Sequence, residues 1–161
     1  MTRRVVSAII LRPADTTPYA SGDLVGNSTT GSAVIPAQFD LVPGQKGGTA
    51  TIKRVRIIKS GTGIVNAAFR VHLYGASPVP VTNGDNGVWL SKRAGYMGSV
   101  DVTVDKAFSD GAAGVSAGDA NISTKLLKST SKVFALLEAR GAYTPGSAEQ
   151  FEVILEAEVD D

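Results

Sequence analysis

The clearest alternation of hydrophobic and polar positions lies near the C-terminus. From 151 to 159 every second residue is apolar, and glutamates occupy several of the intervening positions. Because successive side chains of a β-strand point to opposite faces, this two-residue period predicts a strand with one buried face. The same alternation over 69–74 and 100–104 predicts two further half-buried strands.

Two apolar segments lack this alternation. Apart from Glu138, residues 133–139 are apolar at both the odd and the even positions. This predicts a central strand covered on both faces, although a buried helical turn also fits. Residues 5–11 predict a first strand, or alternatively an extended N-terminal arm within 1–18. Their apolar run of about seven residues is far too short to span a membrane and sits at the lower limit for a signal peptide.

Residues 49–59 combine apolar with basic side chains. The alternation predicts one face with Val55 and Ile57 in the core. The other face would hold the remaining four side chains: Ile52, Arg54, Arg56 and Ile58. A face that is half apolar and half basic is expected where the outer side of a strand contacts another loop or another subunit. The turn residues 60–63 predict a hairpin that makes 49–59 and 67–74 antiparallel neighbours.

Turn-forming residues separate the predicted strands. Pro, Asn, Asp and Gly crowd into 78–87, and the Gly/Ala/Ser-rich segment 110–119 is expected to be a flexible loop. Residues 122–132 fit either a short helix or a strand. The whole pattern predicts an all-β fold of about seven to nine strands with at most a short helix. An antiparallel β-sandwich or jelly-roll-like barrel, in one domain over 1–161, is the expected architecture.

Composition and charge narrow the function. The 161 residues carry a net charge of +1, whereas proteins that hold nucleic acid or a lipid surface usually carry a large positive excess. We therefore expect neither partner. The charges are segregated, with a basic stretch from Lys46 to Lys59 and an acidic segment from Glu149 to Asp161. These stripes could pair two strands within one subunit or between neighbouring subunits, or could be two solvated faces.

Candidate catalytic chemistry is sparse. His72, the single histidine, falls on the polar side of its strand, and the chain has no Gly-x-Ser-x-Gly elbow, so we expect a surface or interface histidine. Residues 83–87 offer oxygen ligands without the spacing of an EF-hand loop, which favours a metal-free turn. The chain has no cysteine, and its glycines do not match a P-loop. The sequence thus predicts no catalytic residue, no metal and no cofactor.

Aromatic and basic residues cluster after the turn-rich segment. Trp89 and Tyr96, with Lys92 and Arg93 between them, would suit a binding patch for a sugar or another protein. A single tryptophan in a β-sandwich is, however, more often part of the core.

Three turn-and-strand elements resemble those of structural proteins of tailed-bacteriophage virions. A Tyr-x-x-Gly-Asp-x-Val-Gly element occupies 19–26, a strand ending in a small-residue-plus-Pro turn occupies 69–78, and Gly-Ala-Tyr-Thr-Pro occupies 141–145. The resemblance spans most of the chain. It implies a non-enzymatic head decoration, or cement, protein on the outer capsid surface, assembled in the host cytoplasm as a homotrimer and bound to the major capsid protein.

Two other functional classes stay open at this point. A tail- or fibre-associated module would bind host glycans through exposed Trp89 and Tyr96, and a hydrolase would depend on His72. The candidate interface residues comprise two N-terminal arginines, the mixed face of the 49–59 strand and the two aromatic side chains. They are Arg3, Arg4, Ile52, Arg54, Arg56, Ile58, Trp89 and Tyr96.

Overall fold

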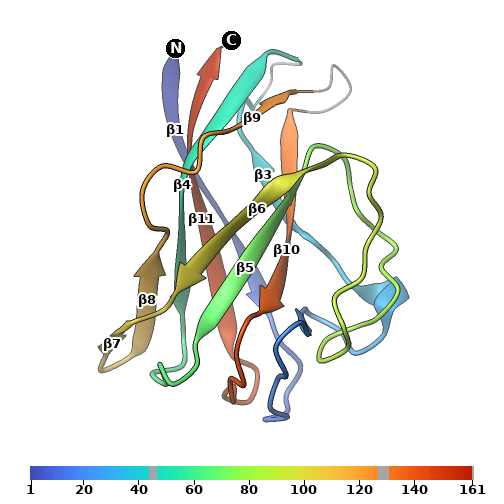
Figure 1. Ribbon diagram of the computed structural model, residues 1–161, viewed down its shortest axis with the longest axis vertical. Coiled ribbons are helices and arrows are strands. Elements are labelled where there is room, and N and C mark those ends of the chain that lie inside the picture. The colour runs from blue at the N-terminus through green and yellow to red at the C-terminus, as the bar shows by residue number, and fades with distance from the viewer. Residues whose placement is uncertain (44–46, 127–130, 161) are drawn as a thin grey trace.

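The computed structural model describes residues 1–43, 47–126 and 131–160. They form two antiparallel sheets packed as a β-sandwich, which confirms the predicted fold class (Figure 1). Eleven strands lie in this part of the chain, and its one helical element is the short 3₁₀ turn η1 (Gly31–Ala33). The strand count exceeds the expected number because four strands have only two to four residues, too few to show an alternation. No helix in the described part is long and apolar enough to cross a membrane.

The strand order is that of a jelly roll. The first sheet has the order β1-β11-β4-β8-β7, with β9 paired to the beginning of β4. Its strands are β1 (Thr2–Leu11), β4 (Thr49–Lys59), β7 (Lys106–Phe108), β8 (Gly111–Val115), β9 (Ile122–Lys125) and β11 (Gln150–Asp160). The second sheet has the order β2-β10-β5-β6, with β3 also paired to β10. Its strands are β2 (Leu24–Val25), β3 (Ala37–Asp40), β5 (Ala68–Tyr74), β6 (Tyr96–Thr103) and β10 (Lys132–Ala139).

The predicted hairpin between 49–59 and 67–74 is wrong. β4 belongs to the first sheet and β5 to the second, so the connection over 60–67 crosses the sandwich instead of reversing within one sheet. Both edges of β4 are already occupied, one by β11 and the other by β8 and β9. The turn residues therefore correctly predicted a reversal of the chain, but they do not indicate which sheet the next strand joins.

A β-bulge also overturns the predicted face of Ile52. The register of β4 against β11 shifts between Arg54 and Ile52, which leaves Lys53 as the extra residue. An extra residue reverses the in–out alternation on one side of the bulge. Ile52 is consequently fully buried in the core beside Val55, and it does not share the outer face of Arg54.

The central strand predicted over 133–139 is confirmed by β10, which lies inside the second sheet. One side of β10, including Leu137, packs in the main core between the sheets. The other side, including Leu136, packs in a smaller apolar cluster with residues of the 75–95 segment, among them Val81 and Trp89. The second sheet is thus covered on both faces.

The segment predicted as a flexible loop over 110–119 contains β8. A Cβ on Gly114 would lie 2.0 Å from the carbonyl oxygen of Thr103, so only glycine permits this approach between β8 and the end of β6. The same small residues that suggested flexibility therefore serve close packing of strands. In the ambiguous zone 122–132 the structure has β9 over 122–125, whereas 127–130 lie outside the described residues.

Tyr19 and Tyr143, from the first and third of the turn-and-strand elements, are buried at the base of the sandwich, where they make polar contacts. The Tyr19 hydroxyl donates to Asp85 at 2.5 Å, and the buried Arg12 guanidinium contacts both groups, with its Nη2 3.2 Å from Asp85 Oδ2. The Tyr143 hydroxyl donates to Glu149 at 2.7 Å. A backbone hydrogen bond from the Tyr19 amide to the Tyr143 carbonyl joins the two groups at 2.9 Å.

We predict that Gly114→Ala lowers the free energy of unfolding by about 3 kcal/mol, because a new Cβ forces strand backbones apart. Gly63→Ala is the matched control, since a Cβ at that position meets no atom within 4 Å. Urea denaturation of both variants measures the difference. Equal stability of the two variants would contradict the close packing of β8.

A second prediction concerns the buried ion pair. Asp85→Ala leaves the Arg12 guanidinium buried without its main carboxylate partner, so we expect a loss of about 3–5 kcal/mol in the free energy of unfolding. Asp15 also contacts Arg12 at 3.2 Å but its side chain is 37% exposed, so Asp15→Ala should cost only about 1 kcal/mol. The same denaturation experiment compares them, and similar losses would contradict the central role of Asp85.

Candidate functional site

The outer face of the first sheet carries a set of exposed apolar side chains. We call this surface the open face, and its five apolar members are Val5, Ile9, Ile58, Phe108 and Val115. Each is between 42% and 61% exposed. Single exposed apolar residues are ordinary on protein surfaces, but a group of them on one sheet face marks a contact surface.

The strand register brings these side chains close together. Ile9 on β1, Glu152 on β11 and Ile58 on β4 lie opposite one another in one row across the sheet. In the adjacent row Ile154 lies opposite Arg56, which in turn lies opposite Val115. Side chains directly opposite on neighbouring strands are about 4.5–5.5 Å apart at Cβ. The apolar side chains therefore lie in neighbouring rows of one face, with Glu152 and Arg56 between them, and we call these rows the apolar strip.

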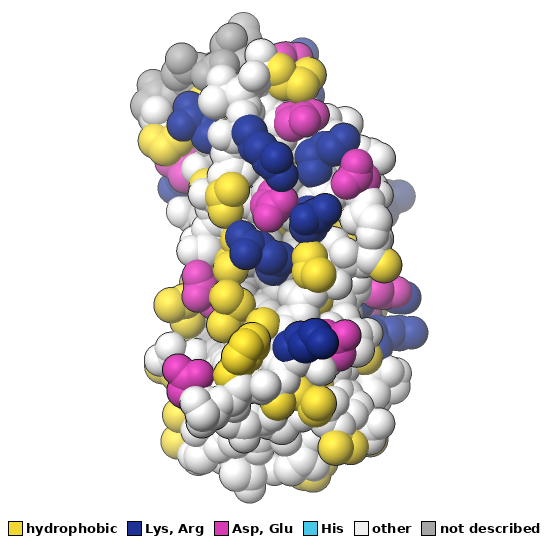
Figure 2. Space-filling model, turned by 90° about the vertical axis from the view of Figure 1, so that its left-hand side faces the viewer, with side chains coloured by type: hydrophobic (Ala, Val, Ile, Leu, Met, Phe, Trp, Pro, Cys, Tyr) yellow, Lys and Arg dark blue, Asp and Glu magenta, His cyan; other side chains and the backbone are white. Residues whose placement is uncertain are grey.

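A band of opposite charges borders the apolar strip. Glu156 on β11 lies 3.2 Å from Arg3 on β1 and 3.5 Å from Arg56 on β4. Figure 2 shows such a band, with hydrophobic side chains gathered below it. The basic and acidic stripes thus pair within one subunit, through adjacent strands. Two of the residues in those predicted stripes, Lys46 and Asp161, lie outside the described residues.

Shallow hollows give the open face its relief. One groove of about 330 Å³ runs beside Ile58, Phe108 and Val115. A second of about 200 Å³ lies between Ile9 and Ile58. The apolar strip is therefore grooved, which lets side chains of a partner insert between the exposed residues.

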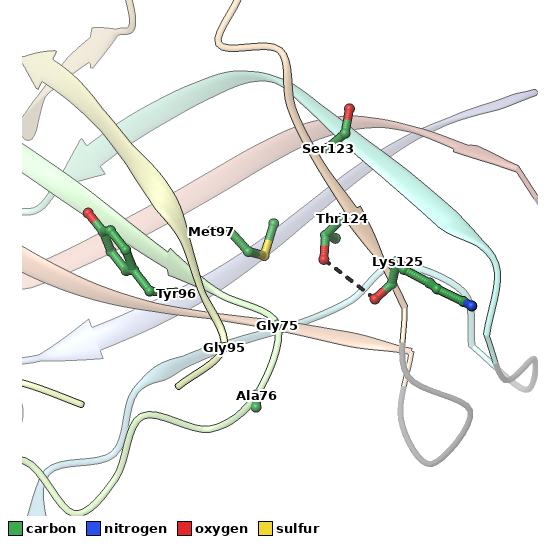
Figure 3. A pocket seen from close by; sticks show the side chains of 8 residues that line it. All are labelled: Gly75, Ala76, Gly95, Tyr96, Met97, Ser123, Thr124 and Lys125. Atoms are coloured by element: carbon green, nitrogen blue, oxygen red, sulfur yellow. Dashed lines mark hydrogen bonds between the residues drawn. The ribbon is translucent and has the colours of Figure 1, made fainter. Parts of the chain in front are cut away.

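A more spacious hollow lies between the beginning of β6 and β9 (Figure 3). It measures about 630 Å³ and is lined largely by backbone and small side chains. Met97 and Thr124 point toward each other across it, whereas the ring of Tyr96 points away. The residues that line this hollow include hydroxyl groups, but they include no carboxylate or imidazole that could act as a general base. The hollow therefore lacks the paired groups of a hydrolytic site.

The single histidine is buried, contrary to the expectation of a surface histidine. Only 3% of His72 is exposed, because the 75–95 segment folds over β5 and stacks Trp89 on the imidazole at a ring-centroid distance of 3.7 Å. His72 Nε2 lies 2.7 Å from Glu138 and Nδ1 lies 3.0 Å from the Tyr96 hydroxyl. Both ring nitrogens are therefore engaged within the protein.

Burial also sets the protonation of this imidazole. Removal from water lowers the pKa of His72 below its ordinary value of 6.5, and the hydrogen bond to Glu138 opposes this effect only in part. The cationic groups of Arg70 and Arg140 act in the same direction as burial. The imidazole is therefore mainly neutral at neutral pH. Its burial under Trp89 indicates a role in packing.

The candidate metal ligands are also engaged elsewhere. In the 83–87 segment the Asp85 carboxylate accepts hydrogen bonds from Tyr19, Arg12 and the Gly26 amide, and its pKa is raised by burial. Across the described residues, no group of three or more His, Cys, Asp or Glu side chains is arranged to hold a metal ion.

The eight candidate interface residues divide into separate regions. The first sheet gathers Arg3, Arg54, Arg56 and Ile58 on the open face. Trp89 and Tyr96 lie with His72 over the second sheet, and Tyr96 is 44% exposed. Arg4 follows Arg3 on β1 and so points to the opposite side of that strand. Ile52 is in the core, because of the bulge described above.

Sequence reasoning missed four members of the open face: Val5, Ile9, Phe108 and Val115. Val5 and Ile9 lie in a strand that the sequence predicted, at the odd positions that are exposed. They were missed because an apolar run does not show which of its two faces is covered. The last two belong to short strands in a Gly/Ala-rich segment, where alternation gives little signal.

Comparison with known proteins gives a distant likeness in structure. No protein-family model and no curated protein matches the chain. Among solved structures, the chain is similar to the acidic stable capsid structure of Helicobacter pylori bacteriophage KHP30, with a TM-score of 0.31 and 14% sequence identity. The match covers 99% of this chain and 97% of that chain. At this distance the function has to be inferred from the surface of the chain itself.

We predict that the His72 imidazole titrates with a midpoint below 6.5. As pH falls from 6.5 toward that midpoint, the unfolded chain binds a proton that the native state does not, so the free energy of unfolding decreases. The single histidine gives one Hε1 signal, which an NMR pH titration follows directly. Trp89→Ala should raise the midpoint by uncovering the ring, and Val88→Ala, which shortens the exposed side chain next to Trp89, is the control. A wild-type midpoint above 6.5 would contradict the burial argument.

Proposed function

We propose that the chain is a non-enzymatic structural protein of a tailed-phage virion, of the head decoration or cement type, and that it attaches to the capsid through the open face. The observation that carries the proposal is the uncovered apolar strip on the first sheet. The 75–95 segment covers β5 and β10 of the second sheet, whereas the first sheet, in its described part, exposes several apolar side chains on its own outer face. The resemblance of the turn elements to phage structural proteins supplies the biological setting.

The energetics suit attachment in many copies. Burying one Val, Ile or Phe side chain fully contributes about 1.5–3 kcal/mol, and the five apolar members of the open face are already about half buried. Their complete burial would contribute on the order of 5 kcal/mol, which the entropy lost on association offsets in large part. A single copy would bind weakly. Contacts repeated over a capsid, with linked copies binding together, would multiply this weak affinity.

The charged band suits the rim of such a contact. Interfaces typically have an apolar centre with a polar, solvent-accessible rim. Arg3, Glu156 and Arg56 are already paired within the subunit, so a partner need not supply opposite charges to bury the adjacent apolar strip. Partner choice would then depend mainly on the shape of the two grooves.

The finer features of the proposal come from the resemblance. The major capsid protein is the proposed partner, the capsid surface the proposed location and a homotrimer the proposed assembly. Light scattering of the purified protein measures the number of copies. The glycan-binding alternative needs exposed aromatic rings. Tyr96 meets this requirement at 44% exposure, whereas Trp89 is partly buried with one ring face on His72.

The test is binding to expanded phage heads that lack this protein. We expect the wild type to cosediment with them and Ile58→Asp to bind at least tenfold more weakly, because a carboxylate would be desolvated at the centre of the contact. Ile35→Asp is the matched control, since Ile35 is 70% exposed but lies outside the open face. Circular dichroism checks that both variants fold.

Two outcomes would contradict the proposal at different levels. Absence of wild-type binding to any form of the head would remove the decoration function. Equal binding of Ile58→Asp and Ile35→Asp would remove the open face as the attachment surface.

A further inference from the structure

The edge of the first sheet at β1 is long and regular, and β3 of the second sheet packs close to it without pairing with it. β1 pairs with β11 along ten consecutive residues without a register shift. In the described residues, no backbone hydrogen bond from 5–11 goes to any segment other than β11. Because the N–H and C=O groups of alternate residues in an antiparallel strand point to opposite sides, about half of them face away from β11. This side of β1 can therefore accept another strand.

The usual protections against strand addition are missing from the same segment. Proteins block open edges with charges, proline, bulges or very short strands. Residues 5–11 contain no charge, proline or glycine. The other edge strands are irregular or short, since β6 carries a register shift next to Tyr74 and β7 has three residues. β1 is thus the most favourable edge for pairing among the described strands.

The exposed side chains of β1 are complementary to themselves. On the outer side the order is Arg3, Val5, Ser7, Ile9 and Leu11. If a second copy pairs antiparallel with Ser7 opposite Ser7, Val5 of each copy lies opposite Ile9 of the other. Arg3 then lies opposite Leu11, where its aliphatic stem can pack. Moving the register by one pair in either direction loses both Val5–Ile9 contacts.

We propose that β1 pairs with β1 of a second copy of this chain, antiparallel and centred on Ser7. The contact joins the two first sheets into one continuous sheet and has two-fold symmetry. Since side chains stand perpendicular to a sheet, the pairing widens the open face without covering it. It is therefore compatible with capsid attachment but does not depend on it. Two trimers joined in this way would contain six copies.

The absence of native cysteine permits a direct test of the register. Ser7→Cys places the two thiols opposite each other at the two-fold axis, at a Cβ distance close to the upper limit that a disulfide allows. Mild oxidation of the purified full chain should therefore convert most of this variant to a disulfide-linked pair. Leu11→Cys is the matched control, because its thiol faces Arg3 of the other copy and should stay reduced at the same protein concentration.

A second measurement does not depend on a disulfide. Sedimentation velocity over a concentration series should show self-association of the wild type that is weakened at least tenfold in Val5→Glu/Ile9→Glu, which sets like charges opposite each other. Val5→Lys/Ile9→Glu removes the same apolar side chains but sets opposite charges in register, and it should retain most of the association.

Equal crosslinking of the two cysteine variants, or equal association of the two charge variants, would overturn the proposal. So would a wild type that shows no even-numbered species at any concentration. None of these outcomes involves phage heads, so they are distinct from a failure of the proposed function.

Discussion

The buried salt bridge between Arg12 and Asp85 determines which side of the sandwich is covered. Asp85 belongs to the segment that crosses the outer side of β5 and β10, and Arg12 directly follows β1 in the first sheet. If either side chain became exposed to solvent, the other would stay buried as an unpaired charge, which is strongly destabilising. The pair, with Tyr19 between them, therefore holds the 75–95 segment against the second sheet. The first sheet has no comparable segment over it, and its apolar side chains stay exposed.

This asymmetry explains why the two aromatic and apolar clusters differ in character. Over the second sheet, Trp89 and His72 form an internal contact in which the imidazole loses water and its pKa falls. Over the first sheet, Ile9 and Ile58 meet solvent in the same sheet positions where a covering segment would otherwise pack. Equivalent strand surfaces are thus packed under a covering segment on one side and exposed on the other.

The sequence predicted those features that local alternation determines, which include the all-β class and the central strand β10. The prediction failed for features that depend on pairing between distant segments. β4 pairs with residues of β11 that lie 90 or more positions away and cannot also pair with β5. The bulge at Lys53 is a property of two strands together, and so the burial of Ile52 could not be read from one of them. Arg54, Arg56 and Ile58 were placed correctly on an outer face, since they follow the bulge. His72 was misplaced because no local signal shows that a loop will cover it.

Charge pairing inside the subunit explains why the remaining adhesive surface is apolar. β4 and β11 are neighbours, so the basic and acidic stripes pair with each other across the sheet, and the whole chain has a net charge of only +1. Such a surface exerts little long-range attraction, because exposed charges are screened within about 10 Å at ordinary salt. Association then depends on short-range contacts, which require shape complementarity and alignment. A rigid jelly roll supplies that alignment, since its strands fix each exposed side chain in a regular row. The proposed adhesive function would therefore depend on the same strand pairing that builds the core.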